Sequence, residues 1–152
     1  MTLEKIVQAL ELEPLTAPPA PAQGAAVAAG QEAPDISKAH VSDLLSDVLA
    51  NAPAGGILLT IQVHMNVLAV AVHAGLAGVI FTSGMKPEEA VRVKAAAENV
   101  PLFATALSTF DAVGKLYALG LRGSSGRAQP AGGRNSGQDR GRDSGQHGGR
   151  GA

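Results

Sequence analysis

Three short and almost purely apolar runs, separated by segments with a helical pattern, constrain the fold of this chain most strongly. The runs cover residues 56–61, 77–82 and 102–105. Each run has the length of a strand, and a strand that is apolar on both faces has to be buried on both faces. Helical connections between such strands make them parallel, with right-handed crossovers. The pattern therefore predicts an α/β domain with three layers, α/β/α, around a mostly parallel sheet.

Two segments beside these runs carry the signals of helices. Residues 41–49 place apolar side chains at helical spacing, which predicts a helix with Ser42 as its N-cap and Asp43 in its first turn. Residues 66–74 are apolar nearly all round and begin at Asn66, a candidate cap. Their bounded length favours a buried helix over a strand.

The second half of the body contains two further helices with clearer boundaries. Pro87 favours the opening turn of a helix that we expect to end at Asn99. Ser108 and Asp111 form a variant of the capping box at the start of the next helix, which Gly120 ends. The apolar stripe of this last helix is expected to consist of Phe110, Val113, Leu116 and Tyr117.

Composition divides the chain, which has the length of one domain, into four zones. Residues 1–16 predict a short helix and a strand that belong to the domain, and residues 35–121 form its body. Residues 17–34 are rich in Pro, Ala and Gly and cannot bury enough apolar surface to offset their ordering entropy, so we expect a linker or insertion. Residues 122–152 are mainly Gly, Arg, Ser, Gln and Asp, which predicts a disordered tail.

Charge is unevenly distributed between the body and the tail. The whole chain has a net charge of −1, but residues 122–152 carry six Arg against two Asp, so the remainder is acidic. An acidic body repels phosphates, and nucleic acid would be attracted only by the tail. Because the tail lacks aromatic side chains that stack on bases, we expect at most weak RNA binding there.

Several kinds of site are disfavoured by what the sequence lacks. There is no Cys to ligate a cluster, and the four His show no ligand spacing, so we expect no metal and no cofactor. Neither a phosphate-binding loop nor a dinucleotide-binding fingerprint occurs, and no catalytic triad follows from spacing. Asp43 and Asp47 lie one helical turn apart, on an expected solvated face. No apolar run reaches the roughly 20 residues that cross a membrane, so we expect a cytoplasmic protein without membrane contact.

Candidate ligand-binding residues follow the carboxyl ends of the three predicted strands. In open parallel sheets ligands bind at this edge, where helix N-termini also offer free N–H groups to anions. Three of the candidates alternate along the chain, and an extended segment would present them on one side. The alternative is that these residues only cap helices and satisfy the local backbone. The candidates are Gln62, His64, Asn66, Thr82, Ser83 and Ser108.

Three stretches of the sequence resemble those of stand-alone DRTGG-domain proteins. They are VSDLLSDV at 41–48, LTIQVHMNVLAVA at 59–71 and LSTF at 107–110. This family is similar to the N-terminal, non-kinase domain of HPr kinase/phosphorylase. The resemblance covers about residues 35–121 and implies a three-layer α/β/α domain, in agreement with the pattern. It places the Asp-Arg-Thr-Gly-Gly segment at 35–40, where this chain reads DISKAH and lacks the arginine and both glycines.

The resemblance also implies a functional context. Such domains accompany catalytic or redox partners, including iron hydrogenases, and are sometimes labelled serine kinase or iron–sulfur hydrogenase. Neither label fits this chain, because a kinase needs a phosphate-binding loop and a cluster needs cysteines. We therefore interpret the chain as a non-catalytic regulatory or docking domain. It would bind a small anionic ligand, such as a nucleotide, or a hydrogenase-type subunit, and we expect a homo-oligomer.

Two alternatives from other functional classes stay open. The first is a small phosphotransferase or phosphohydrolase in which His64, the one candidate general base, activates the attacking group. The second is an RNA-associated protein that acts through residues 122–152. Turnover of ATP with magnesium and the effect of deleting the tail separate these alternatives from a binding domain.

Overall fold

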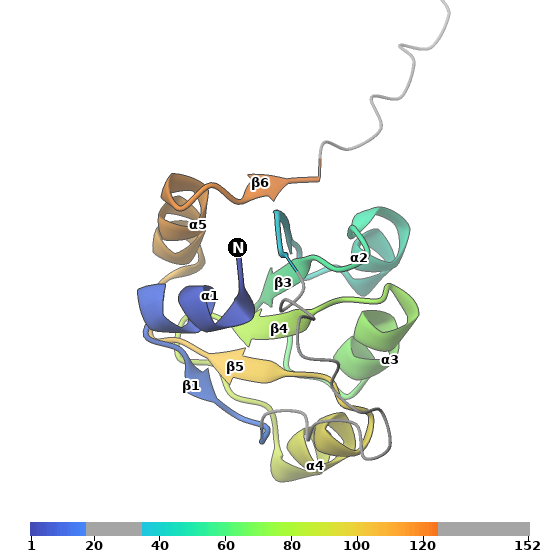
Figure 1. Ribbon diagram of the computed structural model, residues 1–152. Coiled ribbons are helices and arrows are strands. Elements are labelled where there is room, and N and C mark those ends of the chain that lie inside the picture. The colour runs from blue at the N-terminus through green and yellow to red at the C-terminus, as the bar shows by residue number, and fades with distance from the viewer. Residues whose placement is uncertain (18–34, 125–152) are drawn as a thin grey trace, which may run out of the picture.

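The computed structural model describes residues 1–17 and 35–124 (Figure 1). In this part of the chain, six strands form one sheet and five helices surround it. The strands are β1 (Glu13–Pro14), β2 (Lys38–Val41), β3 (Ile57–Thr60), β4 (Gly78–Phe81), β5 (Leu102–Ala104) and β6 (Arg122–Gly123). The helices are α1 (Leu3–Ala9), α2 (Leu45–Asn51), α3 (Asn66–His73), α4 (Glu89–Ala97) and α5 (Thr109–Ala118).

The sheet has the order β1-β5-β4-β3-β2-β6 and is parallel except at one edge. Neighbouring strands from β6 to β5 run in the same direction, whereas β1 runs antiparallel to β5. The three predicted buried runs are the central strands β3, β4 and β5, with helices between them. The prediction of an α/β fold with a mostly parallel sheet is therefore confirmed, and the carboxyl ends of β2 to β5 meet at one edge.

Alternation along the strands divides the core into two layers, one on each face of the sheet. In β3 every residue is buried; Leu59 belongs to the cluster with α1 and α5, and Leu58 to the cluster with α2, α3 and α4. Successive side chains of a strand point to opposite faces, so a strand apolar throughout needs helices on both sides. Figure 1 shows α1 and α5 separated from α2, α3 and α4 by the sheet. Burying each large aliphatic side chain contributes about 1.5–3 kcal/mol.

The predicted helix over residues 41–49 is shorter than its pattern, and this prediction is corrected. Val41 is the last residue of β2, where it pairs with Leu59, and α2 begins only at Leu45. The N-cap is Leu44 rather than Ser42. Pairing along a parallel strand outweighs the helical spacing, because the strand continues the sheet beside β3.

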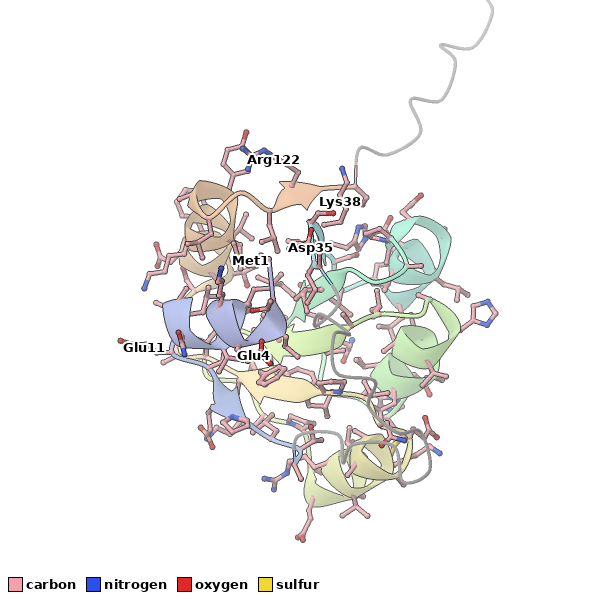
Figure 2. All side chains as sticks on the ribbon, in the orientation of Figure 1. Met1, Glu4, Glu11, Asp35, Lys38 and Arg122 are labelled. Atoms are coloured by element: carbon pink, nitrogen blue, oxygen red, sulfur yellow. The ribbon has the colours of Figure 1, made fainter. Side chains whose placement is uncertain are left out.

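The N-terminal zone is part of the same structure. Ile6 and Leu10 of α1 are buried in the core cluster that contains Phe103. The N-terminal ammonium of Met1 contacts the carboxylate of Asp35, and these two labelled residues lie close together in Figure 2. The described segments on either side of residues 18–34 are therefore joined by direct contacts.

The ordered structure continues past residue 121, whereas the sequence predicts that the tail begins at residue 122. Arg122 and Gly123 form β6, which pairs with Lys38 and Ala39 of β2. Residues 18–34 and 125–152 lie outside the described residues, so the predicted linker and the remainder of the predicted tail stay predictions. Within the described ranges, no helix has the length and apolar character that crossing a membrane requires.

Candidate functional site at the carboxyl ends of the parallel strands

The loop that follows β3 is built around the carboxylate of Asp43. Buried Thr60 donates from Oγ1 to Oδ1 of Asp43 at 2.9 Å, and the backbone N–H of Ile61 donates to the same oxygen at 2.8 Å. The backbone N–H of Gln62 donates to Thr60 Oγ1 at 3.0 Å. Asp43 therefore fixes the path of the chain out of β3. The prediction that Asp43 lies in a helical turn is wrong, because it lies in the loop before α2, but the residue is exposed as predicted.

The predicted trio of Gln62, His64 and Asn66 lies in this loop and at the start of α3. Gln62 is half-buried, whereas His64 and Asn66 are exposed. His64 Nδ1 accepts a hydrogen bond from the backbone N–H of Asn66 at 3.2 Å, so His64, which precedes the N-cap Met65, satisfies the first free N–H of α3. Since β3 ends at Thr60 and Asn66 is already helical, the predicted extended geometry does not run through all three residues.

A short hydrogen bond ties the loop after β4 to the start of α5. Thr82 is fully buried, and its Oγ1 lies 2.6 Å from Oγ1 of Thr109. The next residue, Ser83, is exposed and has a φ of +57°, a conformation that non-glycine residues rarely adopt. Its backbone N–H donates to the carbonyl oxygen of Leu107 at 2.7 Å. The Ser83 N–H is therefore already engaged, and its hydroxyl is the group left facing solvent.

Ser108 begins α5 as the sequence predicts. Its Oγ accepts a hydrogen bond from the backbone N–H of Asp111 at 3.1 Å and donates to the Asp111 carboxylate at 2.7 Å. The predicted N-cap role of Ser108 is confirmed, whereas the Asp111 carboxylate accepts from the Ser108 hydroxyl instead of from the backbone N–H that a capping box uses. The carboxylate of Asp111 also places a negative charge at the N-terminus of the helix, the position where an anionic ligand would otherwise bind.

Positive charge is scarce along this edge of the sheet. The loops that follow β2, β3, β4 and β5 are all described by the structure, and Lys86 is the one Lys or Arg in them. Its Nζ pairs with Oε2 of Glu13 at 2.6 Å. The carboxylates of Asp43 and Asp111 stand in or beside the same loops. The edge is therefore better suited to polar, weakly charged groups than to a polyphosphate.

A second polar cluster lies at the far end of the sheet, between β2, α2 and the end of β6. Nε2 of His40 is 2.9 Å from Oδ2 of Asp47, and Nδ1 of His40 is 3.1 Å from Oγ of Ser124. Asn51 donates to the other carboxylate oxygen at 2.7 Å. Hydrogen bonds from Asn51, Ser42 and His40 lower the pKa of Asp47. Asp47 therefore joins α2 to the sheet, while its side chain stays 35% exposed to solvent.

An apolar hollow of about 60 Å³ lies beside α5, away from the loops that hold the candidate residues. Val41, Leu59 and Tyr117 line it together with residues of β6. Sites for drug-sized molecules occupy about 300–1,000 Å³, so this hollow is too small for a nucleotide. A ligand at the candidate edge would have to bind on the loops themselves.

The sequence indicated the loops correctly but missed three residues that shape or flank them. Asp43 and Thr109 were not proposed because their contacts join segments that no local pattern connects. Phe110 and Tyr117 were expected in the apolar stripe of α5, but they are 86% and 60% exposed. Leu116 of the predicted stripe is buried, together with Ala112. The spacing of Ala112 and Leu116, four residues apart, is the signal that would have identified the buried side of α5.

The fold resembles that of one solved regulatory structure. It is the crystal structure of the CBS and DRTGG domains of the regulatory region of Clostridium perfringens pyrophosphatase, complexed with its activator diadenosine tetraphosphate. The TM-score is 0.57 and the sequence identity 16%, over 76% of this chain and 45% of the other. At this identity the likeness concerns the fold, and the chain spans less than half of that structure. No curated protein matches the sequence.

The family comparison agrees with the architecture. The DRTGG domain matches residues 42–119, which is just over half of the chain. The match contains β3, β4, β5 and all the helices from α2 to α5, together with every predicted site residue. Residues 35–40 lie outside it, so the substituted segment predicted there falls before the matched region. On this match and this fold, the chain belongs to the DRTGG domain family.

Proposed function

We propose that this chain is a non-catalytic regulatory domain that binds a nucleotide-type ligand on the loops after β3, β4 and β5. The observation that carries the proposal is the hydrogen bond between Thr82 and Thr109, which holds two of these loops together. Through it, the loop that carries exposed Ser83 is joined to the start of α5, beside exposed Ser108, by a contact whose Thr82 side is fully buried. A binding surface held in place before the ligand arrives costs less ordering entropy on binding.

The charges of the edge suggest which part of a nucleotide would be recognised. With Lys86 already paired to Glu13, phosphates gain little from the loops. Hydroxyls, the amide of Gln62 and the imidazole of His64 instead suit the hydrogen-bonding edges of a base and a ribose. We therefore favour a ligand with one nucleoside and few phosphates, whose affinity depends only weakly on salt. The regulatory region of the Clostridium perfringens pyrophosphatase, solved in complex with diadenosine tetraphosphate, has a similar fold. This similarity of fold is the support that it gives to a nucleotide-type ligand.

Calorimetric titration of the full chain with adenosine, AMP, ATP and diadenosine tetraphosphate tests the proposal. Gln62→Ala and His64→Ala should each weaken binding about tenfold, the loss of one hydrogen bond to a ligand. The chain offers matched controls on other surfaces, Gln8→Ala in α1 and His73→Ala in α3, which are both exposed and should bind normally. If none of the four ligands binds, or if all four variants bind alike, the proposed site is wrong.

The other interpretations lack a supporting contact in the described part of the chain. His64 bonds only to the backbone N–H of Asn66 there, with no carboxylate to orient it as a general base. A hydrogenase-type subunit stays a prediction, and RNA binding would involve the tail outside the described residues. Turnover of ATP with magnesium that disappears in His64→Ala would replace the regulatory proposal by a catalytic one.

A further inference from the structure

The outward side of α5 has an unusual composition for a solvent-facing helix. Two of the four aromatic residues of the chain lie on it, with Phe110 86% and Tyr117 60% exposed. Aromatic side chains are enriched at protein interfaces, because they bury a large area when a partner covers them. The exposed residues that share this side at helical spacing, here named the α5 seam, are Phe110, Asp111, Gly114, Tyr117 and Ala118.

Gly114 at the centre of the seam has no explanation within one copy of the chain. It lies in the interior of a helix, where glycine is less favourable than alanine. A Cβ built on it would meet nothing within 4 Å, so neighbouring residues do not require a glycine. By contrast, a Cβ on Gly56 would come within 2.9 Å of the carbonyl oxygen of Pro53. The position of Gly114 is understandable if another backbone approaches it from outside.

We propose that the α5 seam is a self-association surface on which α5 of a second copy packs antiparallel, crossing at Gly114. A two-fold axis through this position brings together residues equally distant from it along the helix. Phe110 precedes Gly114 by four residues and Ala118 follows it by four, so the large side chain of one copy faces the small one of the other. The glycines at the crossing let the two helices approach closely.

Charge complementarity favours a second copy over an unrelated helix. Asp111 precedes Gly114 by three residues and Tyr117 follows it by three, so the symmetry places Asp111 opposite Tyr117 of the second copy. The guanidinium of Arg122 lies over this same Tyr117 ring, 4.1 Å from its centroid. Figure 2 shows Arg122 at the end of α5. The pairing of Asp111 with Tyr117 occurs twice in the dimer, and each time it brings the Asp111 carboxylate of one copy toward the Arg122 guanidinium of the other. The dipoles of the two antiparallel helices also attract each other.

Sedimentation velocity of the full chain over a range of concentrations is the first test. The wild-type chain should convert from monomer to dimer as its concentration rises. Gly114→Leu should weaken this association by about tenfold or more, because the added side chain holds the helices apart. The same substitution should raise the melting temperature of the monomer at low concentration, since the site is open and leucine favours helix. A substitution that weakens dimer association while it raises the melting temperature of the monomer indicates an interface role for Gly114 and not a purely structural one.

Cross-linking provides a second test with a matched control. The chain has no Cys, so Gly114→Cys introduces a single thiol at the proposed crossing. Mild oxidation should yield a covalent dimer rapidly, because disulfides need Cα atoms within about 7 Å. Val93→Cys, at an exposed apolar position of α4, should cross-link far more slowly. A wild-type chain that stays monomeric at every concentration, or equal cross-linking of both variants, would overturn the proposal.

Discussion

The hydroxyl oxygens of Thr82 and Thr109 lie 2.6 Å apart, although 27 residues separate them in the sequence. The bond connects the end of β4 to the first residue of α5 beneath the exposed loops. Because Thr82 is fully buried, water cannot replace its partner when the bond is broken.

Replacing Thr82 by valine keeps the shape of the side chain and removes its hydroxyl. We expect Thr82→Val to lower the free energy of unfolding by about 1 kcal/mol, the net value of one hydrogen bond. Urea unfolding followed by circular dichroism measures the loss. The control is Ser46→Ala, which removes a hydroxyl at an exposed position of α2 and should change stability by less than about 0.5 kcal/mol. Equal stability of Thr82→Val and the wild type would show that the bond is dispensable.

Asp43 accepts two hydrogen bonds on one oxygen, from Thr60 and from the backbone of Ile61. Asp43→Ala leaves the buried Thr60 hydroxyl and one N–H without this acceptor, and should cost about 1–3 kcal/mol of stability. Asp43→Asn retains an acceptor oxygen and should cost less. Chemical denaturation of both variants ranks them. If the asparagine variant is as unstable as the alanine variant, the carboxylate charge rather than the geometry is what stabilises the loop.

Asp47 should make stability depend on pH. Its pKa is lowered in the folded chain, first by the hydrogen bond from Asn51 and then by those from Ser42 and His40. A carboxyl whose folded pKa is depressed stabilises the fold above its unfolded pKa, and this contribution is lost as pH falls through the folded value. The stability difference between wild type and Asp47→Ala should therefore be full near pH 6 and shrink below about pH 4. Thermal melts across this range measure it, and a constant difference down to pH 2 would contradict the assignment.

Ser83 adopts a positive φ of +57° at the exposed tip of the loop after β4. Glycine has no steric penalty in this conformation, but it also gains freedom in the unfolded chain. Ser83→Gly should therefore be neutral or more stable by up to about 1 kcal/mol, while Ser83→Val should be destabilised by more than about 1 kcal/mol. Melting temperatures of the pair give the comparison. A valine variant as stable as wild type would mean that the turn relaxes to a negative φ.

The sequence predicted the central elements because their signals are local. Continuous apolar runs gave β3 and β4, and Ser108 with Asp111 gave the start of α5. It missed β2 because none of the four residues of this strand is fully buried, so they form no continuous apolar run, and Val41 also fits a helical spacing. Strand pairing decided between the two, and pairing is a property of the whole sheet.

The candidate site was predictable only in outline. The topology placed Gln62, Thr82 and Ser83 in loops at one edge, as parallel strands require. What holds these loops in place, including the contact of Asp43 with Thr60, joins segments far apart in the sequence. No spacing rule identifies such partners, because each contact depends on how the helices pack on the sheet.

The short antiparallel strand β1 has a consequence for how copies of this protein can assemble. Pro14, which pairs with Phe103, has no backbone N–H to offer to a further strand. An edge that ends in proline resists the edge-to-edge pairing that leads to fibrils and aggregates. On this side the sheet is closed to growth by strand addition, so association there would depend on side chains instead of on the backbone.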